Sequence, residues 1–406
     1  MDDDGAFLIY RIQICGRFYG KWRRAFECRE RSIQRMEMKK LGFGTMRLPL
    51  VNPEDKADID IRQVCRMVDL FLERGFTYFD TAYMYHLYAS ETAVRKALVE
   101  RHPRESFVLA DKLPLSHLKE KEDMARIFDE QLEKCGVEYF DYYLLHNVFQ
   151  ASYETAKRLD AFGFAREKLE EGKIRHLGFS YHADAELLEE ILKAHPEVEF
   201  VQLQLNYLDW ESPYIQSRRC YEVCRRYGKD VIVMEPVKGG TLADVPEAAK
   251  ALFKERRPEM SPASWAVRFA AGKEGVIMVL SGMSDEAQLL DNTSYMQDFK
   301  PLDETEEQVI RQVTDILNSS IAVGCTGCRY CVEGCPKQIA IPEYFSLYNQ
   351  YRQFGDKSNA KGYYPNYTAR HGAAADCIGC KKCEHICPQH LPIAALMEDV
   401  SAVFDA

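Results

Sequence analysis

The chain has 406 residues, a formal net charge of −10, 46% hydrophobic residues and 14 cysteines. This length and apolar fraction suit a globular protein with a large core, such as one α/β barrel followed by a small module. The negative charge argues against general binding to nucleic acid or anionic membranes, no apolar run is long enough to span a bilayer, and the acidic start is unlike a secretory signal. We therefore expect a cytoplasmic protein whose partners include neither nucleic acid nor a membrane.

The first 37 residues are rich in arginine and have poor hydrophobic periodicity, and a regular strand pattern begins only at Lys40. Chain termini are usually the least ordered parts of a domain. We therefore expect residues 1–37 to be a poorly ordered extension, either a basic arm, a mobile tail or a translation artefact.

Strand-like and helix-like segments alternate from residue 38 to residue 300. Eight short, mostly apolar segments have the pattern of parallel strands covered on both faces, over 39–48, 77–82, 106–113, 139–147, 174–181, 200–208, 230–237 and 275–283. Amphipathic segments such as 61–75 and 122–136 lie between them. Eight such units predict a closed (β/α)8 TIM barrel; the alternative is a doubly wound open sheet, for which no G-x-G-x-x-G motif opens a helix.

Eight of the cysteines fall in two groups after residue 320. Each group has the spacing C-x2-C-x2-C-x3-C-P, with Cys325, Cys328, Cys331 and Cys335 in the first and Cys377, Cys380, Cys383 and Cys387 in the second. Bacterial-type ferredoxins bind two [4Fe–4S] clusters with this run. Zinc prefers two separated ligand pairs, and disulfides are disfavoured in a reducing compartment, so both are the weaker alternatives.

In such a run three thiolates hold one cube, and the fourth, followed by proline, points to the other. We therefore expect one cluster on Cys325, Cys328, Cys331 and Cys387, and a second on Cys377, Cys380, Cys383 and Cys335. Residues 319–406 then resemble a bacterial two-[4Fe–4S] ferredoxin domain, after a connecting helix within 301–318. A helix over 341–354 is expected to pack Tyr344, Tyr348 and Tyr351 onto the module itself or onto the barrel.

Four polar residues follow early strands of the predicted barrel: Asp80, Tyr85, Lys112 and His146. Active sites of such barrels lie at the carboxyl ends of the strands, so these side chains are expected to face one mouth. A lysine ammonium lowers the pKa of a neighbouring tyrosine, an aspartate keeps the lysine charged, and a histidine orients a carbonyl oxygen. Together they suit carbonyl reduction, although each alone could be a helix cap, a solvated charge or a core residue.

Over residues 38–300 the chain resembles the aldo/keto reductases. The resemblance rests on Asp80, Tyr85, Lys112 and His146 and on the segments GFGTMRLP (42–49), GFSYH (178–182), VQLQLNY (201–207), MEPVKGG (234–240) and SGMSDEAQLLDN (281–292). It implies a catalytic tetrad of these four residues. It also implies NAD(P)H-dependent reduction of a small-molecule carbonyl, or the reverse oxidation of an alcohol.

The resemblance further implies which residues contact the nicotinamide cofactor. They are Thr45, Met46, Ser180, Gln202, Met234, Pro236, Gly239, Gly282, Ser284, Gln288 and Asn292. Tyr181 stands where relatives usually have asparagine, and Met234 where a tyrosine commonly stacks on the nicotinamide. NADP-specific relatives place cations at the positions of Gly282 and Gln288, and Asp285 would repel a 2′-phosphate, so these departures favour NADH.

The two predicted halves carry electrons differently. Nicotinamides transfer two electrons as hydride and each cube transfers one, and the sequence has no motif for a flavin that could connect them. Three functions are compatible with this: a carbonyl reductase with structural or docking clusters, an electron-transfer protein that serves a ferredoxin-like partner or a quinone-like substrate, and a redox sensor. The complete tetrad favours the first. Tyr83, Tyr207, Trp210 and Tyr214 are expected to form either an aromatic substrate mouth or a packed rim.

Overall fold

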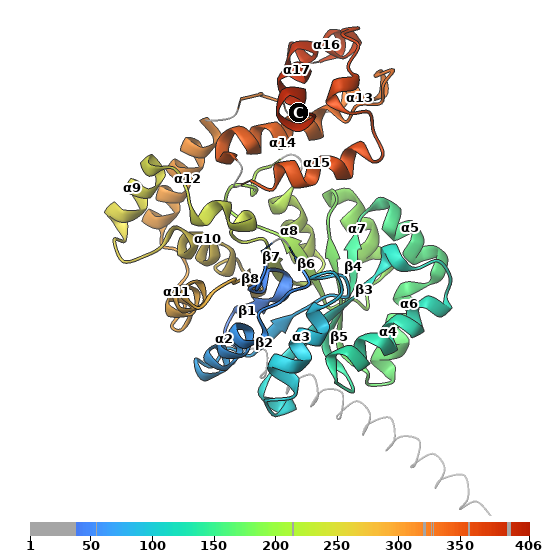
Figure 1. The fold of residues 1–406 in the computed structure, drawn as a ribbon, viewed down its shortest axis with the longest axis vertical. Coiled ribbons are helices and arrows are strands. Elements are labelled where there is room, and N and C mark those ends of the chain that lie inside the picture. The colour runs from blue at the N-terminus through green and yellow to red at the C-terminus, as the bar shows by residue number, and fades with distance from the viewer. Residues whose placement is uncertain are drawn as a thin grey trace, which may run out of the picture.

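The computed structural model describes residues 38–53, 55–212, 215–319, 322–325, 327, 329–355, 358–387 and 391–406. The predicted extension 1–37, Cys328 and Tyr214 lie outside these residues. Figure 1 shows a barrel surrounded by helices, with a smaller helical module at one end. The strands are β1 (Leu41–Gly44), β2 (Tyr78–Asp80), β3 (Val108–Pro114), β4 (Phe140–Val148), β5 (Ile174–Tyr181), β6 (Phe200–Gln204), β7 (Asp230–Met234) and β8 (Val276–Gly282).

The eight strands close into one parallel barrel in chain order, because β1 pairs with β8 as well as with β2. This confirms the predicted (β/α)8 fold and excludes the open doubly wound sheet. Helices around the barrel are α2 (Ile61–Glu73), α3 (Ser90–Val94), α4 (Glu122–Cys135), α5 (Gln150–Leu159), α6 (Ala161–Glu170), α7 (Ala185–Ala194), α8 (Ser217–Arg226), α9 (Glu247–Arg256), α10 (Pro262–Ala271) and α11 (Glu286–Met296). The chain then continues through α12 (Glu304–Ser319), α13 (Tyr330–Glu333), α14 (Ile341–Phe354), α15 (Ala360–Thr368), α16 (Lys382–Ile386) and α17 (Ile393–Phe404).

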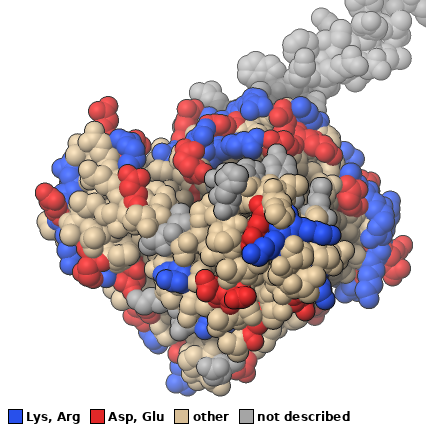
Figure 2. Space-filling model, turned by 90° about the horizontal axis from the view of Figure 1, so that it is seen from above, with Lys and Arg blue, Asp and Glu red and all other residues tan. Residues whose placement is uncertain are grey.

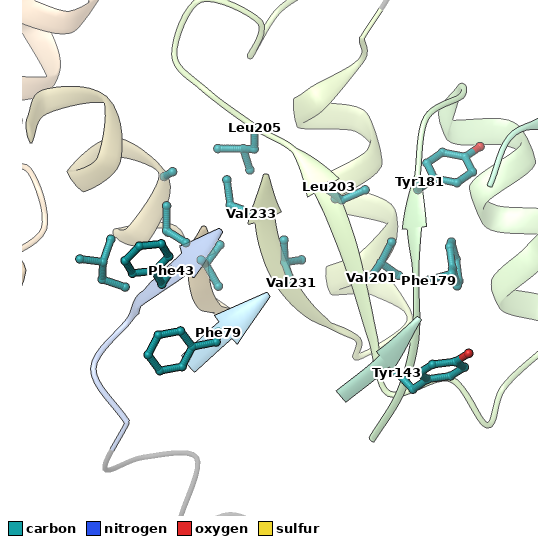
Figure 3. Close-up of a cluster of buried hydrophobic side chains, with 14 of the residues drawn as sticks. Phe43, Phe79, Tyr143, Phe179, Tyr181, Val201, Leu203, Leu205, Val231 and Val233 are labelled. Atoms are coloured by element: carbon teal, nitrogen blue, oxygen red, sulfur yellow. The ribbon is translucent and has the colours of Figure 1, made fainter. Parts of the chain in front are cut away.

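Side chains alternate between the two faces of each barrel strand. Those that point outward, such as Phe43 and Phe79, form the large core between strands and helices (Figure 3). Those that point inward, such as Tyr78 and Phe200, fill the barrel and form its floor. A Cβ on Gly178 would lie 2.5 Å from the Phe200 ring, so the glycine makes room for this aromatic side chain. Residues two positions after the floor residues face the same interior, one layer nearer the carboxyl ends of the strands.

The module has a core of its own, built around α14, the helix predicted over 341–354. Tyr344 and Tyr348 are buried in this core and Tyr351 packs against it, so the tyrosines pack the module onto itself. One contact with the rest of the chain comes from the end of α14. Phe354 packs against the barrel core, and the amide of Gln353 donates to the Leu317 carbonyl of α12 at 2.7 Å.

Surface charge of both signs is interspersed over the face seen in Figure 2, where Lys and Arg do not gather into one patch. Among the helices that the structure describes, none combines the length and the apolar composition needed to cross a membrane.

A buried ion-pair network ties α12 to the barrel helices. Glu306 accepts hydrogen bonds from both terminal nitrogens of Arg268 at 3.0 and 2.9 Å and from Arg257 Nε at 2.9 Å. The Glu306 and Arg268 side chains are only 1% and 5% exposed. Burial by itself raises the pKa of Glu306, but the hydrogen bonds from Arg268, the Asp303 backbone and Arg257 prevail and lower it to about 2.

Replacing Glu306 with glutamine should destabilise the protein by about 3 kcal/mol at neutral pH, because Arg268 is left buried without its counter-charge. The pKa of Glu306 falls from an ordinary 4.5 to about 2 on folding, so its contribution is present above pH 4.5 and is lost as the pH falls toward 2. Urea unfolding of the parent and Glu306→Gln at pH 7 and at low pH measures both effects. The difference between the two proteins should shrink on acidification.

The matched control is Glu307→Gln, because Glu307 is 45% exposed and lies 3.6 Å from Lys273. An exposed pair of this kind should contribute less than about 1 kcal/mol. Equal unfolding midpoints for Glu306→Gln and Glu307→Gln at pH 7 would contradict the assignment.

Candidate functional site

One layer of inward-facing side chains lies above the barrel floor. It contains Asp80, Lys112, His146, Ser180, Gln202 and Met234, one from each of the strands β2 to β7. Each follows a floor position by two residues, as Asp80 follows Tyr78 and Gln202 follows Phe200. The period-two geometry of strands in a closed barrel therefore gathers these side chains at one mouth.

Lys112 is 1% exposed and carries a charge inside the barrel. Its Nζ donates to Asp80 Oδ1 at 2.5 Å and to the Thr81 carbonyl at 2.6 Å. Burial lowers the pKa of Lys112, but Asp80 and Tyr85 act in the opposite direction and the net shift is upward. Burial likewise raises the pKa of Asp80, while the ammonium opposes that shift. We take the pair as ionised at neutral pH, because the lysine holds its proton more tightly than usual.

Tyr85 lies above this pair, with Lys112 Nζ 5.0 Å from its ring centre. Burial is the largest influence on the pKa of Tyr85 and raises it, whereas Lys112 lowers it. The net shift is upward, so the sequence-based expectation of a lowered pKa is wrong: desolvation outweighs the ammonium. The phenol is therefore protonated at neutral pH, which is the form that a proton donor needs.

The His146 ring stands nearly perpendicular to the Tyr85 ring, at 81°, with the ring centres 6.0 Å apart. Burial, and next the charge of Lys112, lower the pKa of His146 well below its ordinary 6.5, so the imidazole is neutral. His146 Nδ1 and Asp80 Oδ2 are buried and have no hydrogen-bond partner among the residues that the structure describes. Buried polar atoms are normally paired, so these two are available to a bound ligand or water.

A buried polar network lies behind Lys112, between β3 and α4, and sequence reasoning missed it. Asp111 points out of the barrel, and its Oδ1 accepts the Lys112 backbone N–H at 2.8 Å. Gln131 donates to the Lys112 carbonyl at 3.0 Å and to Glu91 at 3.1 Å. Burial, and then the charge of Glu91, raise the pKa of Asp111 well above its usual range, so Asp111 is protonated. Through Asp111 and Gln131 the network holds the Lys112 backbone from behind, and its charged member, Glu91, faces Lys134 at 3.5 Å.

The residues predicted to contact the cofactor lie at the carboxyl ends of the strands in four groups. Ser180, Gln202 and Met234 belong to the inward layer, Thr45 and Met46 lie on the turn after β1, and Pro236 and Gly239 follow β7. In the fourth group Gly282 ends β8, Ser284 lies in the loop after it, and Gln288 and Asn292 lie on α11.

Thr45 and Asn292 are among the members of this set whose side chains bond within the protein. Thr45 Oγ1 lies 2.9 Å from the Asp80 carbonyl, to which it donates. The Asn292 amide donates to Ser281 Oγ at 2.7 Å and accepts from the Tyr295 hydroxyl at 2.5 Å. Asn292 thus connects α11 to β8, and its amide has both of its functions used within the fold.

Ser180 and Tyr181 differ because neighbouring residues of a strand face opposite sides. Ser180 faces inward, and its hydroxyl accepts the Asn147 N–H at 2.7 Å while its own proton remains available. Tyr181 faces outward into the core, and its hydroxyl donates to the Asp184 carbonyl. Tyr181 therefore cannot supply the amide contact of the asparagine that it replaces.

Two of the aromatic residues predicted to form a mouth or a packed rim, Tyr207 and Trp210, pack against Phe269. Tyr207 is buried with its ring edge-on to Phe269, and Trp210 contacts the same ring. Tyr83 instead donates to Glu130 at 3.0 Å.

The two cysteine motifs match in backbone conformation at two described positions. Gly327 and Gly379 have φ angles of 71° and 63°, and Arg329 and Lys381 have φ angles of 64° and 57° at the next equivalent position. A short helix follows in each motif, α13 or α16, and the two helices contact one another. Left-handed residues in such turns can aim backbone N–H groups to one side, a geometry found around Fe–S clusters and phosphates.

One pocket in the module is lined by Cys335, Cys377, Cys380 and Cys383, and it has about 380 Å³ of empty space that is partly open to solvent. Cys335 of the first motif thus lines the same pocket as three cysteines of the second motif. In the described part of the chain, no three His, Cys, Asp or Glu side chains are close enough to hold a single metal ion. Four thiols around one pocket match the ligand number of a [4Fe–4S] cluster. Cys331 is buried in the module core, and Cys325 and Cys387 pack against it.

Comparison with known families covers both halves of the chain. The Aldo/keto reductase family model matches residues 40–315, and the 4Fe-4S dicluster domain model matches residues 324–391. "Probable aldo-keto reductase 1" of Glycine max is 27% identical over 216 residues, 51% of this chain and 58% of that protein. "9,11-endoperoxide prostaglandin H2 reductase" of Trypanosoma cruzi is 26% identical over 293 residues, 71% of this chain and 91% of that protein. The chain thus spans little more than half the length of the soybean relative.

Solved structures match the barrel. A holo aldo-keto reductase from Bacillus halodurans has a TM-score of 0.54 and 24% identity, covering 68% of this chain and 91% of that one. An aldo-keto reductase from Klebsiella pneumoniae in complex with NADPH has a TM-score of 0.53 and 19% identity, covering 68% and 92%. At these identities the likeness establishes the fold alone.

Proposed function

The chain belongs to the aldo/keto reductase family, and we propose that it is an NAD(P)H-dependent carbonyl reductase with Asp80, Tyr85, Lys112 and His146 as its catalytic tetrad. The observation that carries the proposal is the enclosed Lys112–Asp80 ion pair, at 2.5 Å, directly beneath Tyr85. A buried charge is costly to maintain, and its place under a protonated phenol gives it a chemical use.

The bound cofactor supplies a hydride to the carbonyl carbon. Tyr85 donates its proton to the carbonyl oxygen, and the Lys112 ammonium stabilises the phenolate that forms. Asp80 holds Lys112 charged and oriented. His146, which is neutral, donates a ring N–H to the same carbonyl oxygen and sets its direction. In the reverse direction, the same groups remove a proton from an alcohol.

The residues around the mouth fit a nicotinamide cofactor. Ser180 keeps a hydroxyl proton for a carboxamide oxygen, and Met234 can pack its thioether against the ring. We propose NADH as the preferred cofactor, because Gln288 donates to Asp285 at 3.0 Å and neither residue offers a cation to a 2′-phosphate.

Tyr85→Phe should lower carbonyl turnover by roughly a hundredfold or more, because the variant has no proton to donate. Its iron content and its affinity for the cofactor should stay unchanged. Steady-state rates against a panel of aldehydes and ketones, with NADH and NADPH, measure the loss.

The matched control is Tyr78→Phe, which removes a buried hydroxyl that has no partner among the described residues. This control should keep the activity of the parent. Turnover retained in Tyr85→Phe would rule out the tetrad assignment.

We also propose that the module holds two [4Fe–4S] clusters, with one on Cys325, Cys328, Cys331 and Cys387 and the other on Cys377, Cys380, Cys383 and Cys335. The matched backbones and the pocket lined by four thiols support this arrangement, and so does the 4Fe-4S dicluster match. A cytoplasmic location fits the proposal, because reducing conditions keep thiols available as ligands.

Cys335→Ser should lose one cluster and keep the other, so iron and acid-labile sulfide per chain should fall by about half. Anaerobic purification and elemental analysis measure this. Cys135→Ser is the control, because Cys135 is buried behind β3, where its thiol donates to Asp111. Full iron content in Cys335→Ser would exclude this cysteine as a ligand.

Electron transfer to a partner protein is a second candidate function, favoured by the surface around the pocket. Cys380 is exposed, and the side chains of Ile378 and Ile386 are 61% and 55% exposed nearby in sequence. A cluster bound there would lie close to solvent, where a ferredoxin-like partner can approach. The tetrad still favours the reductase, because a purely electron-carrying module needs no buried Lys112.

The two candidate functions predict different responses of the clusters to reduced nicotinamide. If the module exchanges electrons with the barrel, anaerobic addition of NADH should bleach the visible absorbance of the oxidised clusters, and dithionite gives the full amplitude for comparison. A reductase with structural clusters should show no bleaching while it turns over a carbonyl. Bleaching that persists in Tyr85→Phe would favour the electron-transfer function.

A further inference from the structure

Arg47 lies at the mouth of the barrel, on the 3₁₀ turn Thr45–Arg47 that follows β1. A Cβ on Gly282 would lie 3.2 Å from the Cβ, Cγ and Cδ atoms of Arg47, so the arginine stem packs across the end of β8. The Arg47 carbonyl accepts the Ser284 hydroxyl at 2.9 Å. The stem is thus held in place at a position where the sequence predicts a cofactor contact.

The Arg47 guanidinium ends beside Gly239, in the loop after β7. Gly239 has a φ of 65°, and a Cβ there would lie 3.1 Å from Arg47 Nη2 and 3.1 Å from Asn359 Nδ2. Two nitrogen donors therefore approach one glycine, one from the barrel and the other from the module. Neither side chain donates to or pairs with any residue that the structure describes.

Two acidic residues, Asp209 and Glu235, lie near the Arg47 guanidinium, but neither is its ion-pair partner among the described contacts. Lys238 pairs with Asp209 at 2.6 Å, so that carboxylate is already neutralised. Burial raises the pKa of Glu235, while the charges of Lys238 and Arg47 oppose the shift. Glu235 lies within electrostatic reach of Arg47 but forms no ion pair with it among the described contacts.

The packing of the module fixes the position of Asn359. Its neighbours Ser358 and Ala360 are both buried, and Ala360 belongs to the module core. Asn359 precedes α15, which lies between α14 and the barrel in Figure 1. Tyr363, one turn along α15, lies within electrostatic reach of Arg47 and Glu235. The module therefore presents the start of α15 to the loop after β7.

We propose that Arg47 and Asn359 form an anion subsite shared by the two domains, which holds a phosphate of the nicotinamide dinucleotide. The proposal rests on the proposed function, because it requires that the barrel bind this cofactor. A guanidinium and a carboxamide N–H are donors that phosphate oxygens accept, and a glycine without Cβ allows close approach. The subsite brings a cation to this phosphate, and it makes the iron–sulfur module part of the cofactor site.

Fluorescence titration of the intact anaerobic protein with NADH, and separately with NADPH, tests the subsite without any carbonyl substrate. Arg47→Ala should weaken binding by roughly ten- to a hundredfold, and Asn359→Ala by roughly three- to tenfold. Loss with both cofactors assigns the pyrophosphate, whereas loss with NADPH alone assigns the 2′-phosphate. Arg47→Lys, which keeps the charge, should bind more tightly than Arg47→Ala.

Arg311→Ala is the matched control, because Arg311 is exposed on α12. It should leave both affinities unchanged, and all variants should have the iron content of the parent. Parent-like affinity in Arg47→Ala would overturn the subsite, and parent-like affinity in Asn359→Ala would overturn its sharing by the module. A parent protein that binds neither cofactor would overturn the proposed function and the subsite together, so the two failures are distinguishable.

Discussion

The ammonium of Lys112, enclosed in a barrel of apolar side chains, is the charge on which the arrangement of the site depends. Removing such a group from water costs several kcal/mol unless partners replace the lost hydration. Asp80 and the Thr81 carbonyl do so at 2.5 and 2.6 Å; Asp80 ends β2 and Thr81 follows it, beside the lysine on β3. The register that pairs Asp80 with Ala110 brings them together, and a slip of one residue would turn one partner out of the barrel. The strand register of the barrel therefore also provides the counter-charge of Lys112.

The need for one counter-charge at Lys112 also fits the different protonation of two nearby carboxyl groups. Asp80 faces inward against the ammonium, and the pair is ionised. Asp111 faces outward toward Glu91, and burial together with that carboxylate keeps it protonated. One negative charge therefore balances Lys112, and the second carboxyl serves as a neutral hydrogen-bonding group for its backbone. Environments that separate two titratable groups in this way are typical of acid–base sites.

Strand periodicity carries most of what could be predicted from the sequence. Apolar runs with regular spacing predict all eight strands, and the alternation within a strand then places Asp80, Lys112 and His146 on one face. The pKa of Tyr85 could not be predicted in the same way, because desolvation depends on enclosure by residues from several strands. Arg47 and Asn359 were missed for a related reason. They lie far apart in the chain, and their approach at Gly239 depends on how the module docks, which no local pattern records.

The placement of the module bears on how its clusters could influence the barrel. Helices α13 and α16, which carry cysteines of the two motifs, lie on the side of the module away from the barrel in Figure 1, with α14 and α15 between. The surface that meets the loop after β7 is therefore the start of α15, not a cysteine motif. A ligand that binds only the folded module stabilises every element of its core, including Ala360 beside Asn359. Clusters in this module would then act on the barrel by holding α15 in place, a coupling that needs no electron to pass between the two domains.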